Sequence, residues 1–432
     1  MRETRIARTR IGSARSAYTT LVRARRSLDL TPSGRHVSAM RNQNFAASSA
    51  RFFPILLVLL FSTLTAGCFA LKERIEGTNY AAEGAPFIAD DAPIVPSNAD
   101  LPRQEDLIHR IVLVGDAGVP MDSEPVLASL GRWADVYPDD TTVLFLGDNV
   151  YPAGIEEDAV EEGEEILRKQ VASTSATRIF IPGNHDWGHL GDDRLLRQQA
   201  YLDANGIEFI PRDGCPGPTL RTILPPVPGV TRGISTIVFD IDPWYFAEDG
   251  LPKCQDVKTP EALAAEISTL LNENASQWLI VGAHHPLKTG GPHGGFSRGA
   301  VADFLTGAVF LIFGTLQDTY EEGYREIFAP IEAALAESPP DFYVAGHDHN
   351  LQILEGGAHA GMQIVSGAGA TQRVRGGHVT DIEGTLFAHG HPGFVVIDVV
   401  RDTSSDGKER AFVHVVLAEQ DAPAVSMDGG AP

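Results

Sequence analysis

The chain has 432 residues, of which 43% are hydrophobic and 21% charged, so its composition is that of an ordinary globular protein rather than a fibrous or disordered one. Its formal charge of −23 is unevenly distributed, because residues 1–51 carry 11 arginines and only two acidic residues, a net charge of +9. The remaining residues therefore carry about −32. Because a nucleic-acid backbone requires a cationic surface, this acidic body argues against nucleic acid as a partner.

The basic N-terminal region leads into a segment with the pattern of a secretory signal. From Met40 onward, Arg41 and Arg51 precede the apolar run 52–61, which is followed by Leu-Thr-Ala-Gly-Cys at 64–68. These five residues resemble a bacterial lipoprotein cleavage box, although Thr65 stands where leucine is usual. We therefore predict a signal peptide of the lipoprotein type over residues 40–67.

This interpretation predicts that translation begins at Met40 and that residues 1–39 are an untranslated or disordered extension. A lipidated Cys68 would then attach an exported protein to a membrane surface, in the cell envelope or periplasm or at the outer surface. The alternative is an uncleaved membrane anchor with a basic cytoplasmic tail. The apolar run is short for a membrane span, which needs about 20 residues.

Beyond the signal, composition predicts a flexible tether over residues 68–104, one folded domain over 105–420 and a disordered tail over 421–432. Two further cysteines, Cys215 and Cys254, would lie in an exported, oxidising compartment where pairing is permitted. If they pair, their separation predicts a stabilisation of about 3–4 kcal/mol. The alternative is two buried free thiols.

Within the folded domain, apolar strand-like runs first alternate with stretches of helical spacing, and the second half is rich in strands. Strands are expected at 110–115, 142–146, 178–182, 219–224, 234–241, 277–282, 342–345, 351–354, 362–365, 394–400 and 412–417. Helices are expected at 125–137, 156–173, 195–205, 259–274 and 324–337. This order predicts an α/β fold in which two mixed sheets pack together with helices outside, a four-layer α/β/β/α sandwich.

Five short segments each follow an apolar run and place side chains that bind metals at the end of a predicted strand, where such folds collect their ligands. They are Val-Gly-Asp116, Leu-Gly-Asp148-Asn-Val-Tyr151, Pro-Gly-Asn184-His185-Asp186, Val-Gly-Ala-His284-His285 and Ala-Gly-His347-Asp-His349. One Gly-Asp pair alone is most often an ordinary turn. The recurrence of such pairs, with histidine and asparagine among them, predicts one site, and we expect each glycine to permit the sharp turn.

The chemistry of these donors divides them into two sets. Two carboxylates and a phenol, from Asp116, Asp148 and Tyr151, suit a trivalent or otherwise hard ion. A neutral amide oxygen and two imidazoles, from Asn184, His284 and His347, suit a divalent ion such as Zn, Fe or Mn. A shared carboxylate, that of Asp148, would bridge two ions about 3.5–4 Å apart, which together clamp a phosphate and generate hydroxide from a bound water.

These motifs resemble those of the purple acid phosphatases within the calcineurin-like metallophosphoesterases, and most closely the short, tartrate-resistant animal type. The likeness covers roughly Arg110 to Leu417 and includes the sequences Leu-Gly-Asp-Asn-Val-Tyr-Pro-Ala-Gly-Ile, Gly-His-Asp-His-Asn-Leu-Gln-Ile and Val-Ser-Gly-Ala-Gly. Many relatives outside the purple group carry a histidine two residues after the first aspartate. Here that position is Gly118, and Tyr151 stands in the second motif instead.

The resemblance implies two metal ions, Fe(III) and a divalent Fe, Zn or Mn ion, with a charge-transfer colour from the Tyr151 phenolate. Asp116, Tyr151 and His349 would bind the ferric ion, Asp148 would bridge, and Asn184, His284 and His347 would bind the divalent ion. It also implies two catalytic imidazoles, His185 and His293, which contact phosphate or protonate the leaving group. His285 is not expected to be a ligand, and Asp186 would either orient His185 or cap the next turn.

Two features depart from the family pattern. An extra stretch, Ser297–Tyr324, contains an apolar run and would form a lid or cleft wall, an amphipathic helix on the body or, less plausibly, a helix that dips into a membrane. The Cys215 and Cys254 pair has no counterpart in the animal enzymes. Both departures are expected to leave the metal site unchanged and to bear on the substrate.

The sequence therefore predicts an exported two-metal phosphomonoesterase that attacks a small phosphate ester or a phosphoprotein directly with metal-bound hydroxide, at acidic pH as in the family. The enzymatic alternative is a phosphodiesterase or nucleotidase on the same fold. The non-enzymatic alternative is a surface lipoprotein that keeps the fold for binding. The natural substrate, the divalent metal and the oligomeric state do not follow from the sequence.

Overall fold

The computed structural model describes residues 75, 77–81, 84–95, 106–119, 123–188, 193–246, 254, 257–297, 317–370, 377–401, 407–418 and 422–430. All of them belong to one compact unit, which comprises Arg74–Gly299 and Gln317–Pro432. The predicted extension, signal peptide and lipidated Cys68, and most of the extra stretch, lie outside the described residues. No helix within these ranges is long and apolar enough to cross a membrane.

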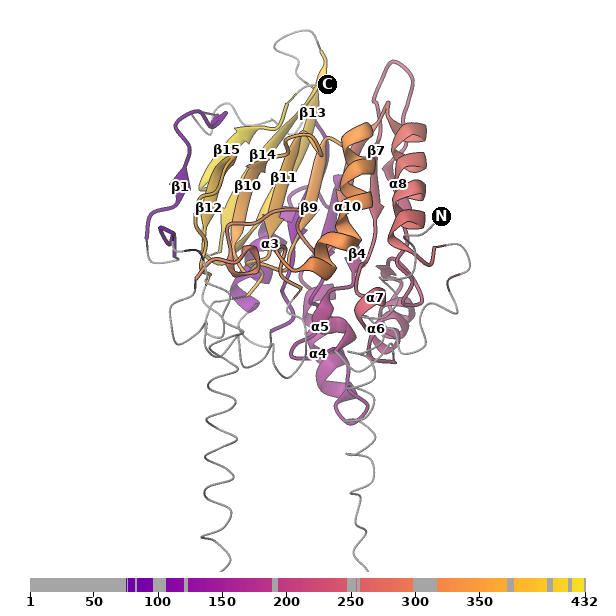
Figure 1. Cartoon of the computed structure of the whole chain (residues 1–432). Helices are drawn as coiled ribbons and strands as arrows, with labels where there is room; N and C mark the ends of the chain where they lie inside the picture. Colours follow the sequence, from indigo (N-terminus) through magenta and orange to yellow (C-terminus); the bar gives the residue numbers. More distant parts are fainter. Residues whose placement is uncertain are drawn as a thin grey trace, which may run out of the picture. The chain divides into compact units, whose positions relative to one another are not determined.

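The described strands form two mixed sheets (Figure 1). The first has the order β15 (Val425–Asp428), β14 (Glu409–Leu417), β13 (Gly393–Arg401), β2 (Leu107–Val114), β3 (Thr141–Leu146), β4 (Thr177–Ile181) and β5 (Glu208–Phe209). The second has the order β1 (Phe87–Ile88), β12 (Thr385–His389), β10 (Leu351–Glu355), β11 (Met362–Ser366), β9 (Phe342–Ala345), β8 (Trp278–Gly282), β7 (Ile234–Val238) and β6 (Thr219–Leu224). Parallel pairing joins β2 to β5 through β3 and β4, and joins β7, β8, β9 and β11.

Alternating side chains along each central strand fill two different layers of the core, as the two-residue period of a strand requires. In β2, Ile111 and Leu113 enter the core between the two sheets, whereas Val112 and Val114 enter the core beneath the helices. In β8, Ile280 likewise faces the space between the sheets and its neighbours face the other side. Because both faces of these strands are covered, they are continuous apolar runs in the sequence.

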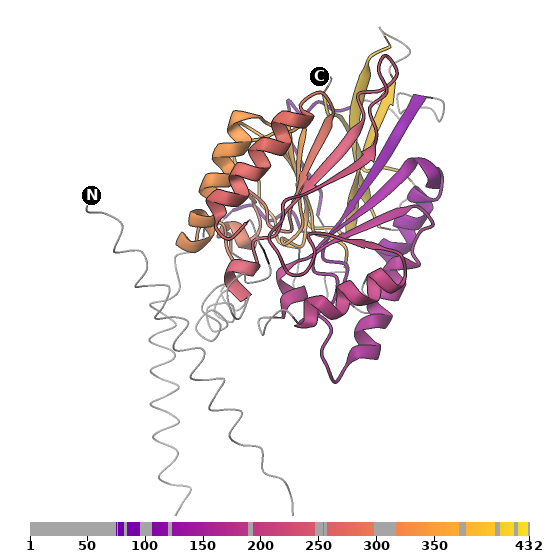
Figure 2. The ribbon, with the colours of Figure 1, turned by 90° about the vertical axis from the view of Figure 1, so that its right-hand side faces the viewer.

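Helices cover the outer face of each sheet. They are α3 (Glu124–Ala134), α4 (Val160–Val171), α5 (Asn184–Trp187), α6 (Asp193–Ala204), α7 (Pro243–Phe246), α8 (Pro260–Asn274) and α10 (Glu322–Glu337), with short 3₁₀ turns η3 (Pro138–Asp140) and η4 (Pro292–Gly294). Figure 2 shows α8 and α10 on one side of the sheets and the helices of the first half of the chain on the other. The predicted four-layer sandwich is therefore confirmed.

Local signals placed the start of α8 and the end of α10 correctly. Thr259 accepts a hydrogen bond from the backbone N–H of Ala262 at 3.2 Å, and Pro260 occupies the first helical position of α8. The helix α10 ends at Glu337, shortly before the two prolines that the sequence places after it. Cys215 and Cys254 form a disulfide, the first of the two alternatives.

The structure differs from the predicted tether and tail. Residues 87–88 form β1 on the edge strand β12, and Ile94 pairs with Met427 at the edge of the other sheet. Residues 425–428, expected to be disordered, form β15 against β14. The physical reason is that Val425 and Met427 alternate into the core between the sheets, although their Ala- and Gly-rich surroundings hid this short pattern.

Candidate metal centre

Loops at the carboxyl ends of five parallel strands carry the predicted ligands to one place. Strands β2, β3 and β4 of one sheet lead to Asp116, to Asp148 with Tyr151, and to Asn184. Strands β8 and β9 of the other sheet lead to His284 and to His347 with His349. Because the two sheets pack face to face, their strand ends meet, and residues from both halves of the chain converge there.

Three of these residues have a backbone conformation that non-glycine residues rarely adopt. The φ angles are +60° at Asp116, +54° at Asp148 and +70° at His347. Such left-handed conformations cost free energy and gather at functional sites, where the surrounding structure holds them in place. Their coincidence at three of the five predicted strand ends points to a site that is built for these side chains.

The adjacent glycines contribute differently from the expectation that each one makes a sharp turn. Only Gly147, with φ +87°, has a left-handed conformation itself. Gly183 is required by close packing instead, since a Cβ atom there would lie 2.4 Å from the backbone nitrogen of Asp148. At Asp116 and His347 the ligand residue makes the left-handed turn, and the glycine before it allows the loops to approach.

The hard-donor set gathers around the phenol of Tyr151. Its hydroxyl oxygen lies 2.9 Å from Oδ1 of Asp116, 2.7 Å from Oδ2 of Asp148 and 3.1 Å from Nε2 of His349. The His349 ring nitrogen is itself 3.4 Å from Oδ1 of Asp116. Four donors from three loops thus point at a common centre.

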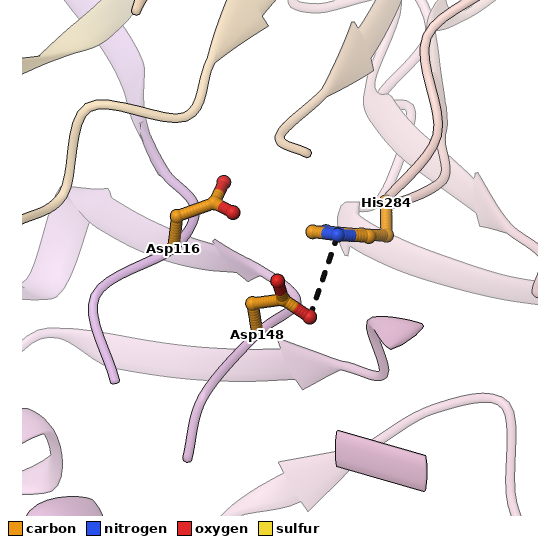
Figure 3. Close-up of side chains that lie close together, drawn as sticks. All are labelled: Asp116, Asp148 and His284. Carbon is orange, nitrogen blue, oxygen red and sulfur yellow. Dashed lines mark ion pairs between the residues drawn. The ribbon is translucent and has the colours of Figure 1, made fainter. Parts of the chain in front are cut away.

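The second donor set gathers around the amide oxygen of Asn184. This oxygen lies 3.1 Å from Nε2 of His284 and 3.2 Å from Nδ1 of His347, and the two imidazole nitrogens are 3.3 Å apart. Figure 3 shows the carboxylates of Asp116 and Asp148 and the ring of His284 directed toward one another. These three residues form a buried group whose ligand atoms all lie within 4.8 Å of one another.

One carboxylate faces both sets. Asp148 directs Oδ2 to the Tyr151 hydroxyl and Oδ1 to Nε2 of His284, at 3.5 Å. This is the position that a bridging ligand of a two-ion site requires. The structure therefore brings all seven predicted ligands together in the two groups that donor chemistry and, for His349, the family resemblance suggested.

The imidazoles are oriented by hydrogen bonds on their far nitrogens, as is usual for histidines that bind metals. Nδ1 of His284 is 2.7 Å from the carbonyl oxygen of Leu146, which leaves Nε2 directed at the centre. Nε2 of His347 is 3.2 Å from the carbonyl oxygen of Gln317, which leaves Nδ1 directed there. Each backbone carbonyl selects the tautomer whose inner nitrogen can bind a cation.

The electrostatic balance of the cluster favours positive charge at its centre. Burial raises the pKa of Asp116 well above its ordinary value. Burial acts in the same direction on Asp148, but His284 and His185 outweigh it and hold the pKa of that carboxyl well below its usual range. Burial lowers the pKa of His284, yet the carboxylates outweigh it and raise the pKa to about 10. A cation bound by these groups would balance the charge of the carboxylates in place of the proton on His284.

A comparison of the sequence with family models agrees with this geometry. The model described as calcineurin-like phosphoesterase matches residues 109–351, which is more than half of the chain. The chain belongs to this family. Members of the family use a dinuclear metal centre, and the buried group around Asp148 is a candidate for it.

Similar solved structures share little sequence with the chain. GAP50, the anchor in the inner membrane complex of Plasmodium, is 15% identical with a TM-score of 0.48, over 75% of this chain and 89% of its own. A dimetal phosphatase from Danio rerio is 10% identical with a TM-score of 0.40, over 75% and 100%. A 5'-nucleotidase from Candida albicans is 13% identical with a TM-score of 0.33, over 64% and 47%. No curated protein matches the sequence significantly.

The two predicted catalytic imidazoles lie beside the donor sets. His185 packs against the Tyr151 ring, with 4.4 Å between ring centroids, and its Nε2 is 4.0 Å from Oδ2 of Asp148. His293 stacks on His347 with 3.9 Å between centroids. His285, which was not expected to be a ligand, is buried behind His284 and His347, and its Nε2 lies 3.9 Å from Asp242.

Asp186 caps the short helix α5, one of the two roles that the sequence suggested, and it also joins two loops of the site. Its carboxylate accepts hydrogen bonds from the backbone N–H groups of Asn149, Val150 and Gly183, and from the Asn149 side chain. It therefore ties the loop of Asp148 to the loop of Asn184. Its pKa is raised to about 7, because burial and the neighbouring Asp148 both oppose its negative charge.

The exchange of histidine for glycine at position 118 has a steric basis. A Cβ atom on Gly118 would lie 2.4 Å from the carbonyl carbon of Asn149, so this loop has no room for a side chain. The backbone of Gly118 instead accepts a hydrogen bond from the N–H of Tyr151, which delivers the phenol to Asp116. The glycine at position 118 and the tyrosine at position 151 therefore belong to the same packing of two loops.

Sequence reasoning missed one segment of the site. It is Gln317–Tyr320, which follows the apolar run of the extra stretch. Gln317 contacts His347, Asp318 and Thr319 contact His293, and Tyr320 holds Asp318. The end of this departure therefore contacts a candidate ligand and a candidate catalytic imidazole, while the seven predicted ligands stay together. No motif marks these residues, and their contacts arise from loops that are close only in the folded chain.

Proposed function

We propose that the chain is a two-metal phosphomonoesterase of the purple acid phosphatase type, which binds Fe(III) and a divalent Fe, Zn or Mn ion. The observation that carries this proposal is the position of Tyr151, whose hydroxyl lies within 3.1 Å of three other predicted ligands of the hard ion. A phenol among carboxylates is the donor set that a hard trivalent cation prefers. A zinc-only site would not need it.

The residues present fit two cations. Asp116, Tyr151 and His349 would hold the first, Asn184, His284 and His347 the second, and Asp148 both. When bound, the cations neutralise the charge of a phosphate ester and activate a water molecule for attack on phosphorus.

The chain's own contribution is to orient the ester and to manage protons. His185 and His293 flank the donor sets, and an N–H group of each imidazole would donate a hydrogen bond to the phosphate or the leaving-group oxygen. Nδ1 of His185 is 2.6 Å from the carbonyl oxygen of Pro152, which directs Nε2 toward Asp148. We propose that activity is highest below neutral pH, as in the purple acid phosphatases that the sequence resembles.

Metal analysis with a visible spectrum tests the type of centre. We expect two metal ions per full-length chain, one of them iron, and a broad visible absorption that Tyr151→Phe removes. Tyr80→Phe is the matched control, because the Tyr80 hydroxyl hydrogen-bonds Asp381, which is not one of the predicted ligands. Colourless, active protein with two zinc or manganese ions would refute the purple type and keep the hydrolase.

Relative rates on aryl phosphate monoesters and diesters test the substrate class. We expect the monoester to be cleaved faster. A preference for the diester or a nucleotide would replace the proposed class with the enzymatic alternative. A metal-loaded protein that turns over neither substrate would favour a binding protein.

We further propose that the protein is exported and held at a membrane surface through lipidated Cys68. The support is the sequence at 64–68 and the disulfide Cys215–Cys254, which suits an oxidising compartment. The intact mass of the membrane-bound protein tests it. A diacylated chain that begins at Cys68 is expected, and a chain that retains residues 1–39 would refute it.

A further inference from the structure

We propose that Asp318 is a positioning residue for His293, and that the segment Gln317–Tyr320 is a built part of the active site. This inference deepens the proposed function and rests on it, because His293 is one of the two imidazoles assigned to the substrate. The segment ends the stretch that departs from the family pattern, so this chain has a support for His293 that the motifs do not contain.

The central contact joins the His293 ring to a buried carboxylate. Nδ1 of His293 is 2.8 Å from Oδ1 of Asp318. The Asp318 side chain is only 2% exposed, whereas that of His293 is 15% exposed. A carboxylate loses most of its hydration in such a place, so it requires strong hydrogen-bond donors, and the imidazole N–H is one of them.

A second contact holds the carboxylate itself. The hydroxyl of Tyr320 donates a hydrogen bond to Oδ2 of Asp318, so each oxygen has a separate partner. The Tyr320 ring lies against Gly295, where a Cβ atom would be only 3.1 Å from the ring. The Asp318 carboxylate is therefore held at both oxygens, by His293 on one and by Tyr320 on the other.

The backbone of His293 is fixed from two directions. Its carbonyl oxygen accepts hydrogen bonds from the backbone N–H of Thr319 at 2.8 Å and from the Thr319 hydroxyl at 3.2 Å. Its N–H donates to Oδ1 of Asp348, the residue between His347 and His349, at 3.3 Å. The same carboxylate accepts a hydrogen bond from the Thr289 hydroxyl at 2.5 Å.

The segment also reaches the second donor set directly. The carbonyl oxygen of Gln317 meets Nε2 of His347, and the Gln317 side chain donates to Oδ1 of Asp242 at 2.6 Å. Gln317 has a left-handed backbone, with φ +55°, at the point where its carbonyl turns to His347. Gln317 and Asp318 thus hold the neighbouring rings of His347, a candidate ligand, and His293.

The consequence is a defined tautomer and direction for His293. With its Nδ1 hydrogen held by Asp318, Nε2 is the atom that would meet a phosphate oxygen. A rotated ring or the other tautomer would present the wrong atom. Partners that orient metal-binding histidines are worth about 10- to 100-fold in activity. We expect loss of Asp318 to lower turnover by a similar factor without emptying the metal site.

The test compares three variants of the full-length, metal-loaded protein with an aryl phosphate as substrate. Asp318→Asn is expected to lower kcat by about 10- to 100-fold while KM changes by less than about threefold. Tyr320→Phe, which frees one oxygen of Asp318 without touching His293, is expected to have a smaller effect in the same direction. Asp203→Asn is the control, because it makes the same change of side chain in an exposed ion pair with Arg212.

A double-mutant cycle with His293→Asn separates positioning from a general structural role. If Asp318 acts through His293, then Asp318→Asn causes no further loss in the His293→Asn protein. An equal loss in both backgrounds would overturn the proposal, as would an equal loss in Asp203→Asn. Metal content is measured for every variant, and loss of metal from Asp318→Asn would also contradict it.

A spectroscopic measurement on the zinc-loaded protein does not depend on activity. With ¹⁵N-labelled histidine, the His293 signals are identified by their loss in His293→Asn. We expect the Nδ1–H tautomer in the wild type and in Asp203→Asn, and a changed tautomer or tautomer mixture in Asp318→Asn. An unchanged His293 in Asp318→Asn would refute the inference. If the wild type hydrolyses no phosphate ester, the proposed function fails, and this measurement still decides the contact.

Discussion

The phenolic oxygen of Tyr151 lies 2.7 Å from one carboxylate oxygen of Asp148, and the other oxygen of that carboxylate faces His284. Asp148 therefore interacts with donors from both sheets, since Tyr151 follows β3 of one sheet and His284 follows β8 of the other. A change at Asp148 should therefore disturb both donor sets, whereas a change at Tyr151 should disturb mainly one.

Asp148→Asn is predicted to abolish stabilisation by metal. A ligand present at 100 times its dissociation constant stabilises a folded protein by about 2.7 kcal/mol, and the variant lacks the charge that both donor sets share. We also expect turnover to fall by more than about 100-fold. Denaturant unfolding with and without metal measures the first effect. Asp203→Asn, which breaks only a surface pair with Arg212, is the control, and equal responses to metal would contradict the prediction.

Gly118→Ala is predicted to destabilise the protein by about 1–3 kcal/mol, because its Cβ atom would overlap the backbone of Asn149. The displaced loop carries Tyr151, so iron content should fall as well. Gly323→Ala is the matched control, since nothing lies within 4 Å of a Cβ atom there and alanine favours helix α10. Unfolding midpoints and metal analysis decide, and equal stability of the two variants would show that the loop adapts.

The stability of the protein is predicted to decline between about pH 6.5 and pH 4 because of His109. Burial lowers the pKa of His109 to about 4, whereas the unfolded chain has the ordinary value near 6.5. The unfolded state therefore binds more protons in this window, which costs the folded state about 3 kcal/mol by pH 4. His109→Gln retains a partner for the Thr142 hydroxyl but does not titrate. Its unfolding free energy should fall less with acid, and parallel curves for the two proteins would refute the assignment.

Loss of the disulfide is predicted to destabilise the fold by about 3–4 kcal/mol, given the 39-residue separation of Cys215 and Cys254. The double variant Cys215→Ser/Cys254→Ser and the chemically reduced wild type should show the same lowered denaturation midpoint. A reducing agent should have no effect on the double variant. If the midpoint of the wild type is insensitive to reduction, the bond contributes nothing to the folded state.

The sequence was most informative where buried parallel strands end in polar residues. Ile111 to Val114 and Val143 to Leu146 are apolar because both faces of their strands are covered, and this made the strands visible. Asp116 and Asp148 then follow directly, so strand position and ligand position were predicted together. The capped start of α8 at Thr259 is a similarly local signal.

The parts that were missed depend on contacts without a local signal. Asp318 is an ordinary acidic residue in the sequence and becomes special only through His293, 25 positions earlier. Strand β1 has two residues, too few for a period to be read, and it exists because β12 offers an open edge. Asp186 looked like a neighbour of His185 but binds the backbone of another loop.

The segment from Phe87 to Val95 has a practical consequence for any shortened form of the protein. It adds β1 to the outer strand of one sheet, and Ile94 and Val95 pair with β15 at the outer strand of the other. A chain that begins at residue 105 would leave β12 and β15 as unpaired edge strands, and exposed edge strands readily pair with strands of other molecules. Recombinant versions that begin upstream of Ile75 should stay in solution, whereas shorter ones should aggregate.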